Sequence, residues 1–120
     1  MVIGDNTNRK GGMTMQRTRD EQIEIANTII SQLGGRKFIV MTGAKDIFAH
    51  PDGVSFKIPG TMTKQHINYL KIALDPNDTY TMCFHRIRGT RAIPIAEHSM
   101  VYHDQLQSIF TAETGLDTRL

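Results

Sequence analysis

The chain has 120 residues, a formal net charge of +2 and a hydrophobic content of 39%. Its length fits one domain with a single core, and its composition is that of a globular chain and not of a disordered one. The single cysteine excludes an internal disulfide framework and a multi-cysteine zinc site, and no apolar stretch approaches the ~20 residues of a membrane span.

The N-terminal segment, residues 1–17, is polar and rich in glycine and asparagine, with no repeating apolar pattern. This composition is typical of a flexible tail and differs from that of a secretory signal. We therefore expect a tail at residues 1–17 and a single domain at residues 18–120.

A helix is predicted directly after the tail. Thr18 and Glu21 have the spacing of a capping box, in which each side chain accepts a hydrogen bond from the other residue's backbone N–H. Gly34 and Gly35 end the helical pattern. Between these signals, apolar residues recur at helical spacing at Ile23, Ala26, Ile29, Ile30 and Leu33.

Beyond Gly35 the apolar period changes to two, which predicts strands. The β-branched and aromatic residues at 36–42 predict a central strand, which Gly43 interrupts and which resumes at 45–49. Pro94 has no N–H for a central ladder, so its segment is predicted as a short edge strand. The remaining strands are expected at residues 54–58, 67–74, 79–88 and 92–96. Turn signatures separate them.

The last element is predicted to be a helix over residues 99–114, with Ser99 as its N-cap and Gly115 as its stop. The connections between strands are too short for crossover helices, so the strands must be antiparallel. The sequence therefore predicts a two-layer α+β domain, with an antiparallel sheet of about four to five strands flanked by an N-terminal and a C-terminal helix. Both helices are expected to pack on one face of the sheet and to leave the other face open.

Charge is unevenly distributed along the chain. Residues 36–91 carry nine basic and four acidic side chains, whereas residues 92–120 carry one basic and four acidic side chains. Basic and aromatic side chains on a flat sheet are what proteins use to bind single strands, because bases stack on rings and cations neutralise phosphates. The simpler explanation of the same charges is that they keep the sheet soluble and prevent edge pairing.

The candidate nucleic-acid site lies on the sheet and its loops. We expect the cations of residues 36–91 to converge on one uncovered surface. Tyr69 is predicted to stack on a base, and the loop that carries Lys64 is predicted to act as a mobile clamp. Phosphate contacts are assigned to Lys57, Lys64, Lys71, Arg86, Arg88 and Arg91.

Catalytic and metal-binding interpretations have less support. Cys83 and His85 lie two residues apart on a predicted strand, and that spacing separates them by ~7 Å, which is too far for a nucleophile and its base. Glu97, His98 and His103 lack the spacing that places ligands on one helix face. We therefore predict no enzymatic activity, no metal and no cofactor.

Four short segments resemble small proteins of phages and prophages that have no assigned activity. They are Phe38-Ile39-Val40-Met41-Thr42-Gly43-Ala44-Lys45, Ile67-Asn68-Tyr69, Arg86-Ile87-Arg88-Gly89-Thr90 and Glu113-Thr114-Gly115-Leu116. The resemblance covers about residues 25–120 and implies a mobile-element origin and a location in the host cytoplasm. No catalytic or binding residue follows from it.

Two functions are consistent with these features. The first is a non-enzymatic accessory protein that binds nucleic acid, with single strands favoured. The second is a protein-interaction module, either an inhibitor of a host protein or a homo-oligomer, in which Ile67, Tyr69 and Ala73 form an apolar interface. Neither function involves a membrane.

Overall fold

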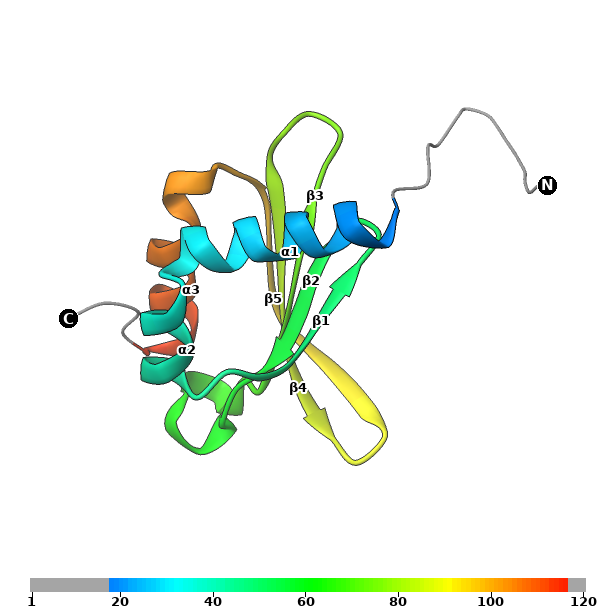
Figure 1. Ribbon diagram of the computed structural model, residues 1–120. Helices are drawn as coiled ribbons and strands as arrows, with labels where there is room; N and C mark the ends of the chain where they lie inside the picture. Colours follow the sequence, from blue (N-terminus) through cyan, green and yellow to red (C-terminus); the bar gives the residue numbers. More distant parts are fainter. Residues whose placement is uncertain (1–17, 117–120) are drawn as a thin grey trace.

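Five antiparallel strands run side by side in the part of the chain that the structure describes, residues 18–116 of a computed structural model (Figure 1). Each strand pairs with the next one along the chain, so the sheet order is β1-β2-β3-β4-β5. The tail predicted at residues 1–17 lies outside the described residues. The strands are β1 (Lys45–His50), β2 (Gly53–Lys57), β3 (Tyr69–Leu74), β4 (Tyr80–Arg88) and β5 (Arg91–Val101).

Within the described residues, three α-helices complete the predicted two-layer α+β architecture: α1 (Arg19–Leu33), α2 (Arg36–Thr42) and α3 (Leu106–Thr114). Helix α1 crosses in front of β1 and β2 in Figure 1, and α2 and α3 lie together near its C-terminal end. Three short 3₁₀ turns connect the elements: η1 (Gly60–Met62), η2 (Lys64–His66) and η3 (His103–Gln105).

Helix α1 begins and ends as predicted. The N–H of Glu21 donates to Oγ1 of Thr18 at 3.2 Å, and the N–H of Thr18 donates to Oε1 of Glu21 at 2.8 Å. The first of these bonds satisfies a backbone donor that the first turn of a helix otherwise leaves free. Ile23 belongs to the predicted apolar stripe but is 41% exposed, so the buried stripe consists of Ala26, Ile29, Ile30 and Leu33.

Helix α2 replaces the strand predicted at residues 36–42, and that prediction is wrong. Gly34 and Gly35 have positive φ angles of 131° and 65°, which let the chain turn sharply from one helix into the next. Phe38 and Thr42, four residues apart, are both buried. This is the spacing of a helix face. In a strand, the residue midway between them would point to the same side as Phe38 and Thr42.

Phe38 explains why tertiary packing overrides the strand propensity of α2. Its ring is fully buried and packs edge-on against Phe56 of β2 and Phe110 of α3, with ring centroids 5.4 Å and 5.0 Å apart. Val40 is 73% exposed, so a β-branched residue that favours a strand lies on the outer side of the helix. Burial of one aromatic anchor outweighs the intrinsic preference of its neighbours.

The last strand is longer, and the last helix shorter, than predicted. The edge strand expected at residues 92–96 continues to Val101, because it pairs with β4 along its whole length through two register shifts. Ser99 therefore lies in a strand and caps no helix. Helix α3 begins only at Leu106 and ends at Gly115, whose φ of 80° gives the left-handed stop that the sequence predicts.

All three helices pack against one face of the sheet, as expected for a two-layer domain. Leu33, Phe38 and Phe110 of the helices are fully buried against alternate residues of the three central strands. The strand residues are Val54, Phe56, Leu70, Ile72, Met82 and Phe84, all with no exposed surface. Every helix within residues 18–116 is too short or too polar to cross a lipid bilayer.

Candidate nucleic-acid interface

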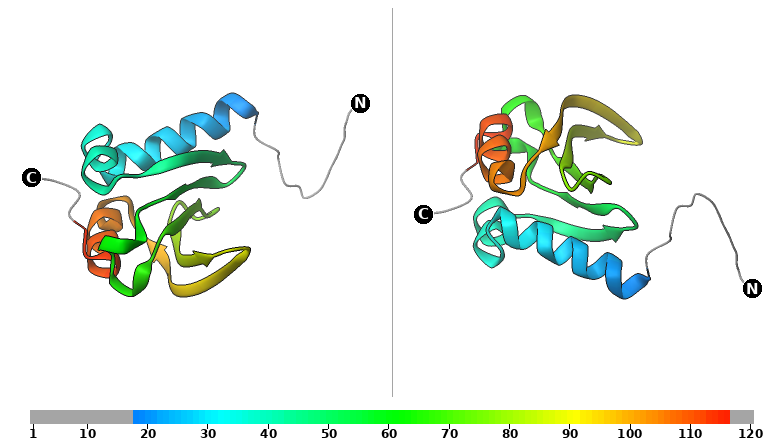
Figure 2. Two further views of the ribbon diagram at one scale, coloured as in Figure 1. Left: turned by 90° about the horizontal axis from the view of Figure 1, so that it is seen from below. Right: turned by 90° about the horizontal axis from the view of Figure 1, so that it is seen from above.

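The sheet face opposite the helices carries the side chains that alternate with the core residues, and we call it the open face. Figure 2 shows the three helices gathered on one side of the strands. The antiparallel register aligns the open-face residues of β2, β3 and β4 in rows across the sheet. The open face consists of Ser55, Lys57, Tyr69, Lys71, Ala73, Thr81, Cys83 and His85. Of these, Ser55 is buried at 2% exposure, Lys57 is exposed and the others are half-buried.

The first row joins three of these residues, because Lys57 is the register partner of Tyr69 and Tyr69 is the partner of His85. The rings of Tyr69 and His85 meet edge-on with centroids 5.9 Å apart. The Lys57 ammonium lies 3.6 Å from a carboxylate oxygen of Asp46, and both side chains are about half exposed. An ion pair this exposed contributes about 0–1 kcal/mol, so Lys57 can exchange its carboxylate for another anion at little cost.

The second row crosses four strands, from Ser55 through Lys71 and Cys83 to Glu97 of β5. Partial burial raises the pKa of the Cys83 thiol, and the carboxylate of Glu97 raises it further, while the ammonium of Lys71 opposes the shift. Ser55 is held by a 2.7 Å hydrogen bond to Nε2 of His50 on β1. Lys71 therefore supplies a cation at the centre of the open face, and Glu97 supplies a carboxylate at its margin.

This row predicts how fast Cys83, the only cysteine of the chain, reacts with iodoacetamide. A raised pKa leaves less thiolate near pH 8, so the folded protein is expected to react more slowly than the denatured chain. Glu97→Gln is expected to raise the rate, and Lys71→Gln is expected to lower it. If both variants shift the second-order rate constant of Cys83 alkylation in the same direction, the register described here is contradicted.

The arginines assigned to phosphate contact gather on the β4–β5 hairpin, which projects away from the helices (Figure 1). Arg88 and Arg91 are register partners beside the turn. Arg86 and Arg88 alternate along β4 with His85 and Ile87, so their side chains start on the side of the strand that is opposite to the open face. The hairpin arginines are therefore separate from the two rows.

Lys64 lies on η2, at the helical side of the molecule. Its ammonium donates a 3.0 Å hydrogen bond to the carbonyl oxygen of Ala112 in α3, and its side chain passes beside Gly115. The loop predicted to be a mobile clamp is thus attached to α3. It takes no part in the interface proposed below.

The expected convergence of all cations of residues 36–91 on one surface does not hold. Arg36 and Lys37 lie on α2, because their segment is helical and does not belong to the sheet. The hairpin arginines and the η2 lysine also point elsewhere. Within the described residues, the structure brings together Lys57, Tyr69 and Lys71 of the predicted site, and adds His85 beside them.

The residues considered for metal binding are separated by the fold. His98 faces the helices, where its Nε2 lies 2.5 Å from a carboxylate oxygen of Glu113 in α3. Glu97, its neighbour on β5, belongs to the opposite face. Among residues 18–116, no three side chains of His, Cys, Asp or Glu are grouped so that they could hold a metal ion.

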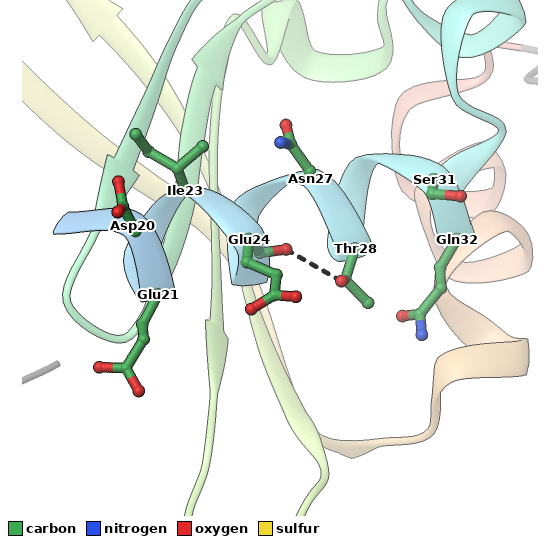
Figure 3. Close-up of a pocket in the computed structure, with 8 residues that line it drawn as sticks. All are labelled: Asp20, Glu21, Ile23, Glu24, Asn27, Thr28, Ser31 and Gln32. Atoms are coloured by element: carbon green, nitrogen blue, oxygen red, sulfur yellow. Dashed lines mark hydrogen bonds between the residues drawn. The ribbon is translucent and has the colours of Figure 1, made fainter. Parts of the chain in front are cut away.

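A shallow hollow of about 710 Å³ runs along the outer side of α1 (Figure 3). Asp20, Glu21 and Glu24 line its N-terminal part, and Oγ1 of Thr28 donates to the carbonyl oxygen of Glu24 at 2.9 Å. Its acidic lining repels a polyanion. This hollow therefore does not belong to the candidate interface.

Sequence reasoning missed a cavity of about 350 Å³ at the end of the open face. Lys45 of β1 and Lys57 of β2 are register partners, and both line this cavity. Asn68 forms part of its wall, with its side chain bonded to the backbone of Ile87. The pairing of the two lysines depends on an irregularity in β1, which no local sequence signal reveals.

Comparison of the chain with protein-family models, curated proteins and solved structures finds no significant match. The functional interpretation therefore rests on the geometry of the described residues.

Proposed function

We propose that this protein binds single-stranded nucleic acid on its open face and has no enzymatic activity. The observation that carries the proposal is that Lys57, Tyr69 and Lys71 share one sheet face on which none of the helices of residues 18–116 packs. In line with the phage resemblance of the sequence, we further propose that it is an accessory protein of a phage or mobile element in the host cytoplasm.

Lys57, Tyr69 and Lys71 each have a definite role in this proposal. The half-buried ring of Tyr69 stacks on a base, and its edge-on contact with His85 limits the orientations available to it. Lys57, the register partner of Tyr69 on β2, and Lys71, two residues from Tyr69 along β3, neutralise phosphates. Because every base has a π-face and the phosphates carry no sequence information, such binding tolerates most sequences.

The carboxylates around the open face restrict the path of the strand. Glu97 is the register partner of Cys83 on β5, and Asp46 lies beside Lys57. Like charges repel, so phosphates avoid the margin at Glu97, and a phosphate beside Lys57 has to displace the exposed carboxylate of Asp46. The proposed interface is therefore narrow and involves few phosphates.

Salt dependence tests this proposal, with the affinity for a fluorescent oligonucleotide of about ten nucleotides measured from about 50 to 200 mM salt. Two neutralised phosphates predict a slope of about −1.4 in a plot of log affinity against log salt. Lys71→Gln is expected to reduce the slope by about 0.7. Lys37→Gln, which removes an exposed lysine from α2, serves as the matched control and is expected to leave the slope unchanged.

Absence of binding at the lowest salt, or a slope that Lys37→Gln reduces as much as Lys71→Gln, would contradict the proposal. The first result removes the activity. The second assigns it to overall charge and not to the open face.

The second candidate function is a protein-interaction module, and one observation favours it. Phe48 on the edge strand β1 is 61% exposed, and it is the register partner of Ser55, at the border of the open face. Its neighbour Ile47 is 39% exposed. An exposed aromatic residue on a sheet edge is suited to contact with a host protein or a second copy. The mass of the protein in solution tests the homo-oligomer. A mass equal to that of one chain, and the same mass for the Phe48→Ser variant, would exclude it.

A further inference from the structure

We propose that the cavity at the end of the open face holds one nucleotide unit of the bound strand, with its phosphate between Lys45 and Lys57 and its base against the apolar wall. This inference deepens the proposed function and rests on it. The cavity measures about 350 Å³, which lies within the range of sites for small organic ligands.

Two ammonium groups supply the anion-binding half of the cavity. Lys45 and Lys57 are register partners on neighbouring strands, so their side chains leave the sheet on the same side. Both side chains are exposed at the end of the β1–β2 pair that is far from the connecting turn, and both line the cavity. A pair of ammonium groups repels itself unless an anion lies between the two, so this arrangement favours a bound phosphate.

Ile58, Pro59 and Ile87 supply the apolar half of the cavity. Ile58 is buried at 3% exposure, Ile87 is half-buried and Pro59 is exposed. A bare phosphate leaves this apolar surface wet, whereas a base joined to the phosphate covers it. The combination of two cations with an apolar wall therefore fits a nucleotide better than an inorganic anion.

Backbone and amide bonds hold the wall in place. Oδ1 of Asn68 accepts the N–H of Ile87 at 2.6 Å, and Nδ2 of Asn68 donates to the carbonyl oxygen of Ile87 at 2.9 Å. The N–H of Ile58 donates to the carbonyl oxygen of Asn68 at 3.1 Å. A cavity that is already formed loses little conformational freedom when it binds a ligand.

Asp46 is the anion that a phosphate has to replace. Its carboxylate lies 3.6 Å from the Lys57 ammonium, with both groups about half exposed. Asp46 has a positive φ of 52°, a conformation that asparagine tolerates. Asp46→Asn therefore removes the competing charge without straining the backbone, and it is expected to strengthen binding at the cavity.

The inference is tested with the full chain and three probes, namely thymidine 5′-monophosphate, thymidine and inorganic phosphate, by NMR titration. The monophosphate is expected to bind more tightly than either of the other probes. Lys45→Gln is expected to weaken it about three- to tenfold, and Asp46→Asn to strengthen it about two- to fivefold. Thermal unfolding of each variant checks that the fold is intact.

Equal affinity for the monophosphate and inorganic phosphate overturns the inference. The inference is also overturned if Lys45→Gln and Asp46→Asn leave the affinity for both probes unchanged. Failure of the inference and of the proposed function are distinguishable. If oligonucleotide binding depends on Tyr69 but not on Lys45 or Asp46, the proposed function stands and the cavity site is overturned. If the monophosphate binds and responds to both variants as predicted, but no oligonucleotide binds, the cavity site is supported and the single-strand function is excluded.

Discussion

Phe38→Ala is expected to lower the free energy of unfolding by about 3–5 kcal/mol. The side chain has no exposed surface and contacts aromatic rings of β2 and α3, so its loss leaves a cavity between the two layers. A domain of this size is stable by about 5–15 kcal/mol, so the variant removes a large part of the total. Urea denaturation monitored by circular dichroism measures the change.

Val40→Ala is the matched control for this prediction. Val40 lies two residues from Phe38 and is 73% exposed, so the substitution is expected to change the free energy of unfolding by less than about 0.5 kcal/mol. In a strand the two side chains would share a face, and both substitutions would be costly. Comparable losses in the two variants would therefore contradict the helical assignment of α2.

Tyr69→Ala is expected to weaken binding of a short single-stranded oligonucleotide about five- to 150-fold, because stacking on one base contributes about 1–3 kcal/mol. Tyr69→Phe keeps the π-face and is expected to bind nearly as well as the unmodified protein. Fluorescence anisotropy at fixed low salt measures both affinities. The aromatic ring, and not the hydroxyl group, is thus assigned the main contribution.

Tyr102→Ala provides the control for a general loss of aromatic surface. Tyr102 is 55% exposed and lies between β5 and η3, away from the rows of the open face. Its substitution is expected to leave the affinity unchanged. An affinity that falls equally in Tyr69→Ala and Tyr102→Ala, or that falls in Tyr69→Phe as much as in Tyr69→Ala, would exclude stacking at the open face.

The fold class could be predicted because alternation of apolar residues survives in the central strands, and because short turns allow only antiparallel pairing. The capping box at Thr18 and the left-handed stop at Gly115 are local signals, and the structure confirms both. The α2 segment could not be predicted from its own residues. Its conformation depends on the pocket between Phe56 and Phe110, which exists only in the folded domain.

The candidate site could be predicted in part for the same reason. A period of two fixes which residues of one strand share a face, so Tyr69 and Lys71 could be placed together. The register that adds Lys57 is set across the long connection of residues 58–68. The same period places Arg86 and Arg88 on the side of β4 opposite to the open face. The three arginines are close together in the sequence, which suggests one shared surface and hides this difference. The cavity beside Lys45 depends on long-range register, and no local pattern predicts it.

Protection of Cys83 by nucleic acid tests the central claim most directly, because this thiol lies beside Lys71 in the middle of the open face. An oligonucleotide of about ten nucleotides at saturating concentration is expected to slow alkylation of Cys83 about tenfold, with the rate restored at high salt. In a Cys83→Ser background, a reporter at Ser31→Cys on the exposed side of α1 is expected to react at an unchanged rate. A bound oligonucleotide that leaves the alkylation rate of Cys83 unchanged would contradict the account, and protection of the α1 reporter instead would place the binding site on the helical side.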